Sequence, residues 1–167
     1  MILRTLTLAG GLAGAVATSQ FPEFSQQYMQ RLGGAVDALS GVVADFDASA
    51  QAVGLDRDAA LAQMTGTEFL ERRRADMTQT IARYTSLQSD LTALQGQGPF
   101  MRAYRLPGRT DPQIAQAAWE VYQPAVPLNL AGGIFAAFGF LLGGIVIGFV
   151  LQILRLPFRR KEAANPA

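Results

Sequence analysis

The sequence predicts an all-α protein in which two transmembrane helices flank an extramembrane α-helical hairpin of the coiled-coil kind. Two observations support this class. Apolar residues recur at intervals of three and four through the centre of the chain, and no alternating strand pattern of useful length occurs. Half of the 167 residues are hydrophobic and 16% are charged. Soluble domains carry about 25% charged residues, so the deficit indicates segments that lie in lipid.

The first apolar run covers Thr5–Ser19 and predicts a transmembrane helix within residues 1–23. A helix from Thr5 to Phe24 would be about 30 Å long, which matches the bilayer core. The motif AVA at residues 15–17 also matches the small-x-small pattern of signal peptidase sites. We expect a retained signal anchor, and cleavage after Ala17 is the alternative.

Residues 24–127 are expected to form the extramembrane domain. Apolar residues spaced by three and four predict long helices over about 24–53 and 67–95. Each has one apolar seam, so the simplest arrangement is an antiparallel hairpin that buries both seams. A parallel coiled coil between two copies is the alternative.

Capping patterns predict where helices begin in this domain. Gly54 is expected to end the first long helix, and Asp56 to cap a short turn that follows. Thr65 with Glu68 three residues later suggests a capping box for the second long helix. Thr110 with Gln113 suggests another for a short helix over about 111–122.

The second apolar run contains 27 residues without a charge and predicts a transmembrane helix over 128–154. A basic tail, 155–167, follows it. Because basic residues favour the cytoplasmic side, this tail and Arg4 place both termini in the cytoplasm and the central domain in the opposite compartment.

Small residues recur at helix-packing intervals in both predicted spans. Such residues let two helix backbones approach closely, either within one chain or against another membrane protein. The predicted packing or partner interface consists of Gly10, Gly14, Gly139, Gly143, Gly144 and Gly148.

Aromatic and basic residues beside the spans are expected at the membrane surface, because such residues favour the boundary between lipid and water. The predicted interface residues are Phe21, Phe24, Trp119, Tyr122, Arg155, Arg159, Arg160 and Lys161. Three polar residues lie off the seam of the first long helix and are candidate partner contacts: Gln27, Gln30 and Arg31.

The composition restricts the chemistry available to the chain. Without cysteine or histidine it has no thiolate, no common zinc or haem site, and no easily titrated general base. Residues 20–127 hold nine arginines against twelve acidic residues, and the excess basic charge lies in a short tail, which argues against nucleic-acid binding. We expect no enzymatic activity, no catalytic residue, no metal and no cofactor.

The block QFPEFSQQYMQRLGG, residues 20–34, follows directly on the first apolar run. With the later segment YQPAVPL, residues 122–128, it resembles the bacterial membrane-protein family catalogued as domain of unknown function 2937. The resemblance implies a bacterial inner-membrane setting and a retained first helix. It implies no activity, cofactor or catalytic residue.

These features favour an accessory or scaffold subunit of the bacterial inner membrane. Its expected partners are the lipid bilayer and either other integral membrane proteins or further copies of itself. The alternative is a membrane-anchored module that senses a periplasmic ligand or envelope component through residues 99–122, which include Arg102, Arg105 and Arg109.

Overall fold

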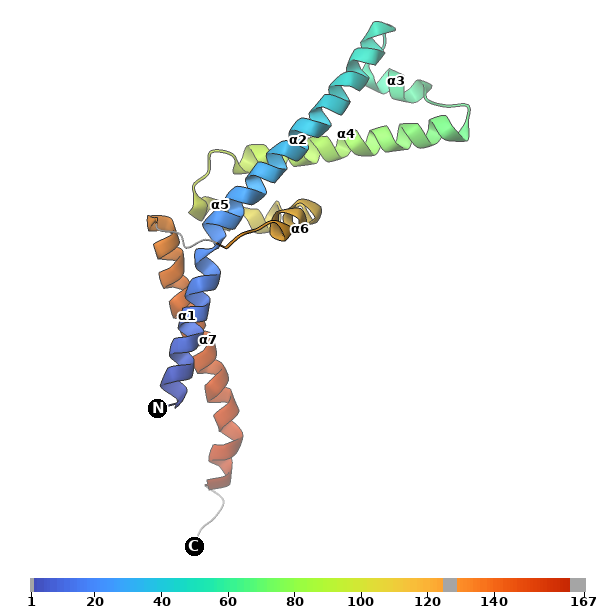
Figure 1. The fold of residues 1–167 in the computed structure, drawn as a ribbon. Coiled ribbons are helices and arrows are strands. Elements are labelled where there is room, and N and C mark those ends of the chain that lie inside the picture. Colours follow the sequence, from blue (N-terminus) through green and yellow to red (C-terminus); the bar gives the residue numbers. More distant parts are fainter. Residues whose placement is uncertain (1, 125–128, 163–167) are drawn as a thin grey trace. The chain divides into compact units, whose positions relative to one another are not determined.

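The structure, a computed structural model, describes residues 2–124 and 129–162, with side chains described for 3–124 and 129–154. Within these ranges the chain is helical and contains no strand, which confirms the all-α prediction (Figure 1). The chain divides into two compact units. The first combines Met1–Ser25 with Gln123–Ala167, and the second is Gln26–Tyr122.

Two long helices make up the first unit. Helix α1 spans Ile2–Ser19, and α7 spans Leu130–Glu162. They lie side by side (Figure 1) and are the two helices whose backbones approach each other most extensively. Asn129 starts α7, since its side-chain oxygen accepts a 2.7 Å hydrogen bond from the backbone N–H of Gly132.

Helix α7 extends beyond the predicted end at Leu154. Its backbone stays helical to Glu162, so residues 155–162 of the predicted tail continue the helix. The segment contains Pro157, which has no backbone N–H to donate, but its arginines, lysine, leucine and glutamate are good helix formers. The predicted start of the second span at Leu128 and residues 163–167 of the tail lie outside the described residues.

Helix α2 spans Phe21–Ala52, close to the predicted 24–53, and enters the second unit at Gln26. Gly54 ends it as predicted, with a φ of 75° that glycine adopts without strain. The N–H of Leu55 reaches back to the carbonyl of Ala50 at 3.0 Å and completes the cap.

Helix α3, Arg57–Gln63, and helix α4, Glu68–Leu94, follow. Asp56 caps α3 as predicted, accepting a bond from the N–H of Ala59 at 2.8 Å. The cap of α4 is Thr67 and not Thr65: the Thr67 hydroxyl accepts from the N–H of Leu70 at 3.2 Å. The Thr65–Glu68 capping box was therefore wrong by two residues.

The segment after Gly98 contains more helix than its prolines and glycines suggested. Helix α5 spans Pro99–Arg105, the 3₁₀ turn η1 spans Leu106–Gly108, and α6 spans Pro112–Glu120. The predicted cap Thr110 is also corrected. Asp111 caps α6 by accepting from the N–H of Ile114 at 2.9 Å, whereas the Thr110 hydroxyl donates to the Leu106 carbonyl.

In the second unit α2 and α4 run in opposite directions and cross obliquely, with α3 between them (Figure 1). The seam of α2 supplies half of the buried apolar residues, and α4, η1 and α6 supply the other half. The buried apolar residues of this unit are Tyr28, Leu32, Val36, Val43, Ala50, Leu87, Leu94, Leu106, Ile114 and Ala118.

Candidate functional site

The glycines of α1 and α7 form the closest contact between helices in the structure. A Cβ atom on Gly14 would overlap the carbonyl of Gly139, and one on Gly143 would overlap the carbonyl of Gly10. The helices are antiparallel, because Gly10 of α1 faces Gly143 of α7 and the later Gly14 faces the earlier Gly139. Glycine is required at these positions, where two backbones come into direct contact.

A side-chain hydrogen bond closes one end of this contact. The hydroxyl of Thr18 lies 2.6 Å from the carbonyl oxygen of Phe135 on α7 and 2.9 Å from that of Gly14 on its own helix. One turn further on, the rings of Phe21 and Phe135 lie 5.4 Å apart. The bond is part-buried, and a hydrogen bond of this kind contributes about 1 kcal/mol.

The remaining predicted glycines do not take part in this contact. A Cβ placed on Gly144 would lie 3.7 Å from the methyl group of Thr7, which is an ordinary van der Waals distance. Nothing lies within 4 Å of a Cβ placed on Gly148. Four of the six predicted glycines thus join α1 to α7 within the chain. Gly148 is half-buried and makes no such contact with α1.

One described helix is long and apolar enough to cross a bilayer. Leu130–Leu154 of α7 has a mean hydropathy of 2.6 over its most apolar stretch, and only 6% of that stretch is buried within the molecule. By length and composition it is a candidate membrane span. Large side chains such as Ile145 and Phe149 are therefore exposed on a helix that also packs against α1.

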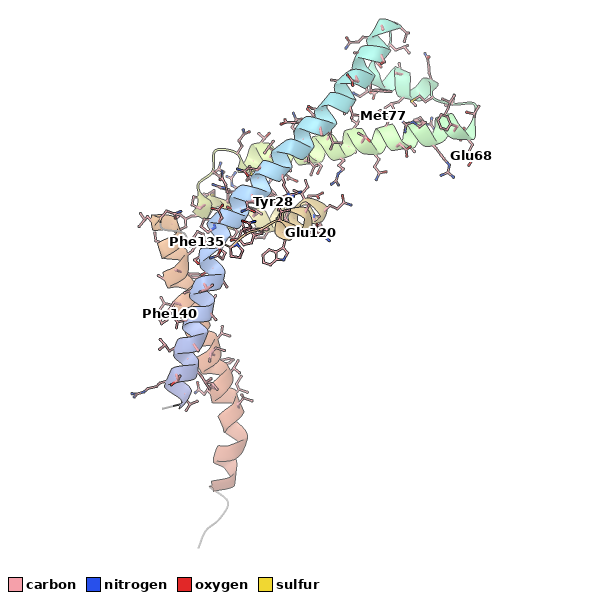
Figure 2. The ribbon with its side chains drawn as sticks, in the orientation of Figure 1. Tyr28, Glu68, Met77, Glu120, Phe135 and Phe140 are labelled. Atoms are coloured by element: carbon pink, nitrogen blue, oxygen red, sulfur yellow. The ribbon has the colours of Figure 1, made fainter. Side chains whose placement is uncertain are left out.

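A shallow groove of about 400 Å³ lies between α1 and α7 where Gly144 leaves space. Leu3, Leu8 and Phe140 make it mainly apolar, and Arg4 is its charged residue. Figure 2 shows Phe140 on α7 in this part of the unit. The groove is open and contains no converging set of reactive groups.

In the second unit Tyr28 of α2 holds the segment that leads into α6. Its side chain is fully buried, its hydroxyl accepts from the N–H of Asp111 at 3.0 Å, and it lies 3.3 Å from the carbonyl of Arg109, to which it donates. Burial raises the pKa of Tyr28 above its ordinary value, although the bond from Asp111 acts in the opposite direction. The phenol therefore stays neutral and serves as donor and acceptor together.

The three arginines of the 99–122 segment are held by their own chain. Arg102 donates to the carbonyl of Gln97 at 3.0 Å and to the side chain of Gln26 at 3.2 Å. Arg105 donates to the carbonyl of Ala93 at 3.0 Å. Arg109 pairs with Asp90 at 3.2 Å, and Arg83 pairs with Asp111 at 3.2 Å. These bonds anchor α5 and the following loop.

The other predicted contact residues lie apart from this network. Gln30 and Arg31 are exposed and Gln27 is half-buried; none makes a hydrogen bond or ion pair among the described residues.

Trp119 and Tyr122 stack with ring centroids 5.8 Å apart. Phe24 is half-buried on α2. Arg155, Arg159, Arg160 and Lys161 lie on the helical backbone of α7, and their side chains are outside the described set.

At the other end of α2, Arg57 forms a two-pronged ion pair with Asp47, at 2.8 and 2.6 Å. These hydrogen bonds lower the pKa of the Asp47 carboxyl. An open cleft of about 440 Å³ adjoins the pair and also touches Asp56 and Asp58. Within the described ranges no three metal-ligating groups converge. The pair joins α3 to α2, and Asp56 serves as a cap.

Several residues of these contacts were missed from the sequence. Thr18 could have been found, because Gly10, Gly14 and Thr18 continue one series of small residues at intervals of four. Tyr28 lies in the apolar seam of the first long helix, and this position predicts burial but no polar role. Its role depends on Asp111, 83 residues away, and no local pattern predicts such a pair.

The family described as "Protein of unknown function (DUF2937)" matches residues 2–160, which include almost all of both units. The chain belongs to the DUF2937 family. This confirms the resemblance of the block at residues 20–34. No curated protein and no solved structure matches the chain. The DUF2937 description names no activity.

Proposed function

We propose that this DUF2937 protein is a non-enzymatic accessory or scaffold subunit of the bacterial inner membrane. It crosses the membrane twice, through α1 and α7, and packs against other membrane proteins or against further copies of itself. Both termini are cytoplasmic, and Gln26–Tyr122 forms a helical domain in the periplasm.

The observation that carries this proposal is the glycine contact between α1 and α7. The two backbones are in direct contact, and Thr18 bonds to Phe135 across the contact. Helix α1 is therefore packed against a helix that is apolar enough to cross a bilayer. At 18 residues α1 is about 27 Å long, close to the bilayer core. A signal peptide removed after Ala17 would leave the facing glycines of α7 uncovered.

The outer surface of α7 supports the scaffold role. Gly148 has open space beside it and lies among exposed apolar side chains, including Ile145 and Phe149. A second membrane helix could approach closely there, as helices do at small residues. The alternative sensing role is less well supported, because Arg102, Arg105 and Arg109 already bond to their own chain.

Purification of the tagged full-length chain in a mild detergent tests this function. We expect it to migrate on native gels in an assembly larger than the monomer, either with co-purifying membrane proteins or as an oligomer. Gly148→Leu should shift the chain toward the monomer, because a large side chain would fill the open position on α7. Recovery of the unmodified chain only as a monomer without partners would contradict the proposal.

A further inference from the structure

Helix α5 and the end of α6 carry five exposed apolar residues that the core of the second unit does not use. We call them the α5–α6 apolar residues. Their exposed fractions are 50% for Phe100, 43% for Met101, 83% for Tyr104, 67% for Trp119 and 57% for Val121. Three of them lie on the single short helix α5, and large exposed apolar groups gathered in this way mark interaction sites.

The structure fixes α5 beside the beginning of α2. The guanidinium of Arg102 bonds to the side chain of Gln26 and to the carbonyl of Gln97, so α5 is held from both sides. Leu106, directly after α5, is buried in the core. With these contacts made, Phe100, Met101 and Tyr104 remain exposed on the same short helix.

Helix α6 is fixed at the same end of the unit. Its cap residue Asp111 bonds to Tyr28, two residues along α2 from Gln26, and its inner face buries Ile114 and Ala118. Figure 2 shows Glu68, at the beginning of α4, at the opposite end of the unit from Tyr28. Trp119 then stacks on Tyr122, where the unit ends.

This end of the unit is also the end at which the chain enters and leaves it. Gln26 comes two residues after Phe24, a predicted membrane-surface residue, and Tyr122 comes eight residues before Leu130, where α7 begins. Both connections lead along the chain to the predicted spans, so the bilayer is the partner to which the sequence ties this end of the unit. Tyrosine, tryptophan and phenylalanine are the residues that favour the region between headgroups and acyl chains.

We propose that the α5–α6 apolar residues insert into the headgroup and acyl-chain boundary of the bilayer and hold the base of the second unit on the membrane surface. The inference rests on the proposed function, since it requires the chain to be a membrane protein. It gives α5 a role, and it gives Arg102 the role of positioning α5.

Fluorescence quenching by brominated lipids tests this directly, because Trp119 is the only tryptophan in the chain. The full-length protein is reconstituted in vesicles of phosphatidylethanolamine and phosphatidylglycerol, with or without bromine near the headgroup end of the acyl chains. Further variants carry Trp119→Phe together with one new tryptophan. These are Tyr104→Trp for α5, Phe138→Trp for the span, and Phe69→Trp as the control.

Phe69 is a suitable control because it is 70% exposed and follows Glu68, the first residue of α4. Figure 2 shows Glu68 at the opposite end of the unit from Tyr28. We expect blue-shifted emission and loss of intensity in brominated vesicles for tryptophans at positions 104, 119 and 138. A tryptophan at position 69 should emit as in water and should not be quenched.

The outcomes separate the two proposals. Quenching at position 138 without quenching at 104 would overturn the α5–α6 inference and leave the membrane function standing. No quenching at 138 would overturn the membrane function, and the inference with it. Equal quenching at positions 69 and 104 would also overturn the inference, because contact with lipid would then follow exposure alone.

Discussion

At the scale of single residues, Tyr28 links α2 to the beginning of α6. Its hydroxyl satisfies a backbone N–H at Asp111 and a backbone carbonyl at Arg109, and its ring fills the core beside Leu32 on the same helix. A phenylalanine would retain the ring contacts. It would leave both backbone groups without their partner in a buried site.

Tyr28→Phe should therefore destabilise the second unit by about 1–3 kcal/mol, the cost of buried polar groups left unpaired. Thermal or urea unfolding of the full-length chain in detergent, followed by helical circular dichroism, measures the change. Tyr104→Phe is the matched control, because Tyr104 is largely exposed. Equal stability of the two variants would contradict the structural role of Tyr28.

The same residue gives the second unit a pH dependence. Burial raises the pKa of Tyr28 in the folded state. The neutral phenol therefore makes its full contribution to the free energy of unfolding at pH values below the ordinary tyrosine pKa of about 10. As pH rises through the raised pKa, that stability is lost. Tyr28→Phe should remove this part of the alkaline destabilisation.

The sequence predicted some of these residues and missed others for a physical reason. Gly54 and Asp56 act locally, through backbone groups at most four residues away, and both were predicted correctly. Thr67 and Asp111 were missed because neighbouring threonines offered the same capping pattern. The choice between adjacent caps depends on where the rest of the helix packs.

At the scale of elements, the α1–α7 pair depends on glycine at facing positions. A side chain on Gly14 would meet the backbone of Gly139, whereas one on Gly148 would meet open space within the chain. Two similar substitutions, both in apolar helices, should therefore differ sharply in effect.

Gly14→Leu should separate α1 from α7, and Gly148→Leu should leave them packed. Oxidative cross-linking between Thr7→Cys and Gly144→Cys reports this, because a Cβ on Gly144 lies 3.7 Å from the Thr7 methyl group and the native chain has no cysteine. We expect the cross-link in the otherwise native chain and with Gly148→Leu. A cross-link of equal yield with Gly14→Leu would show that the glycine contact does not hold the pair.

Element prediction succeeded where periodicity was long. Helices α2, α4 and α6 begin and end within three residues of their predicted bounds, since each has an apolar seam or a clear cap. Helix α5 was missed because its seven residues lie between prolines and glycines, and its large apolar side chains remain exposed. Nothing in a local pattern reveals a helix held by a bond from Arg102 to Gln26.

At the scale of the whole molecule, the chain combines a two-helix unit with a helical domain inserted between its two helices. The DUF2937 match extends over both units. Hydropathy predicted the candidate span in α7. The pairing of Gly14 with Gly139 depends on residues 125 positions apart and required the structure.

The central claim is that α1 is retained and crosses the membrane beside α7. Intact-mass spectrometry of chains labelled in spheroplasts with a membrane-impermeant thiol reagent tests it most directly, using Ala48→Cys and Ala163→Cys in the cysteine-free chain. The account predicts a full-length mass for both variants, with one label on Ala48→Cys and none on Ala163→Cys. A mature chain beginning at Thr18, or the reverse labelling, would contradict it.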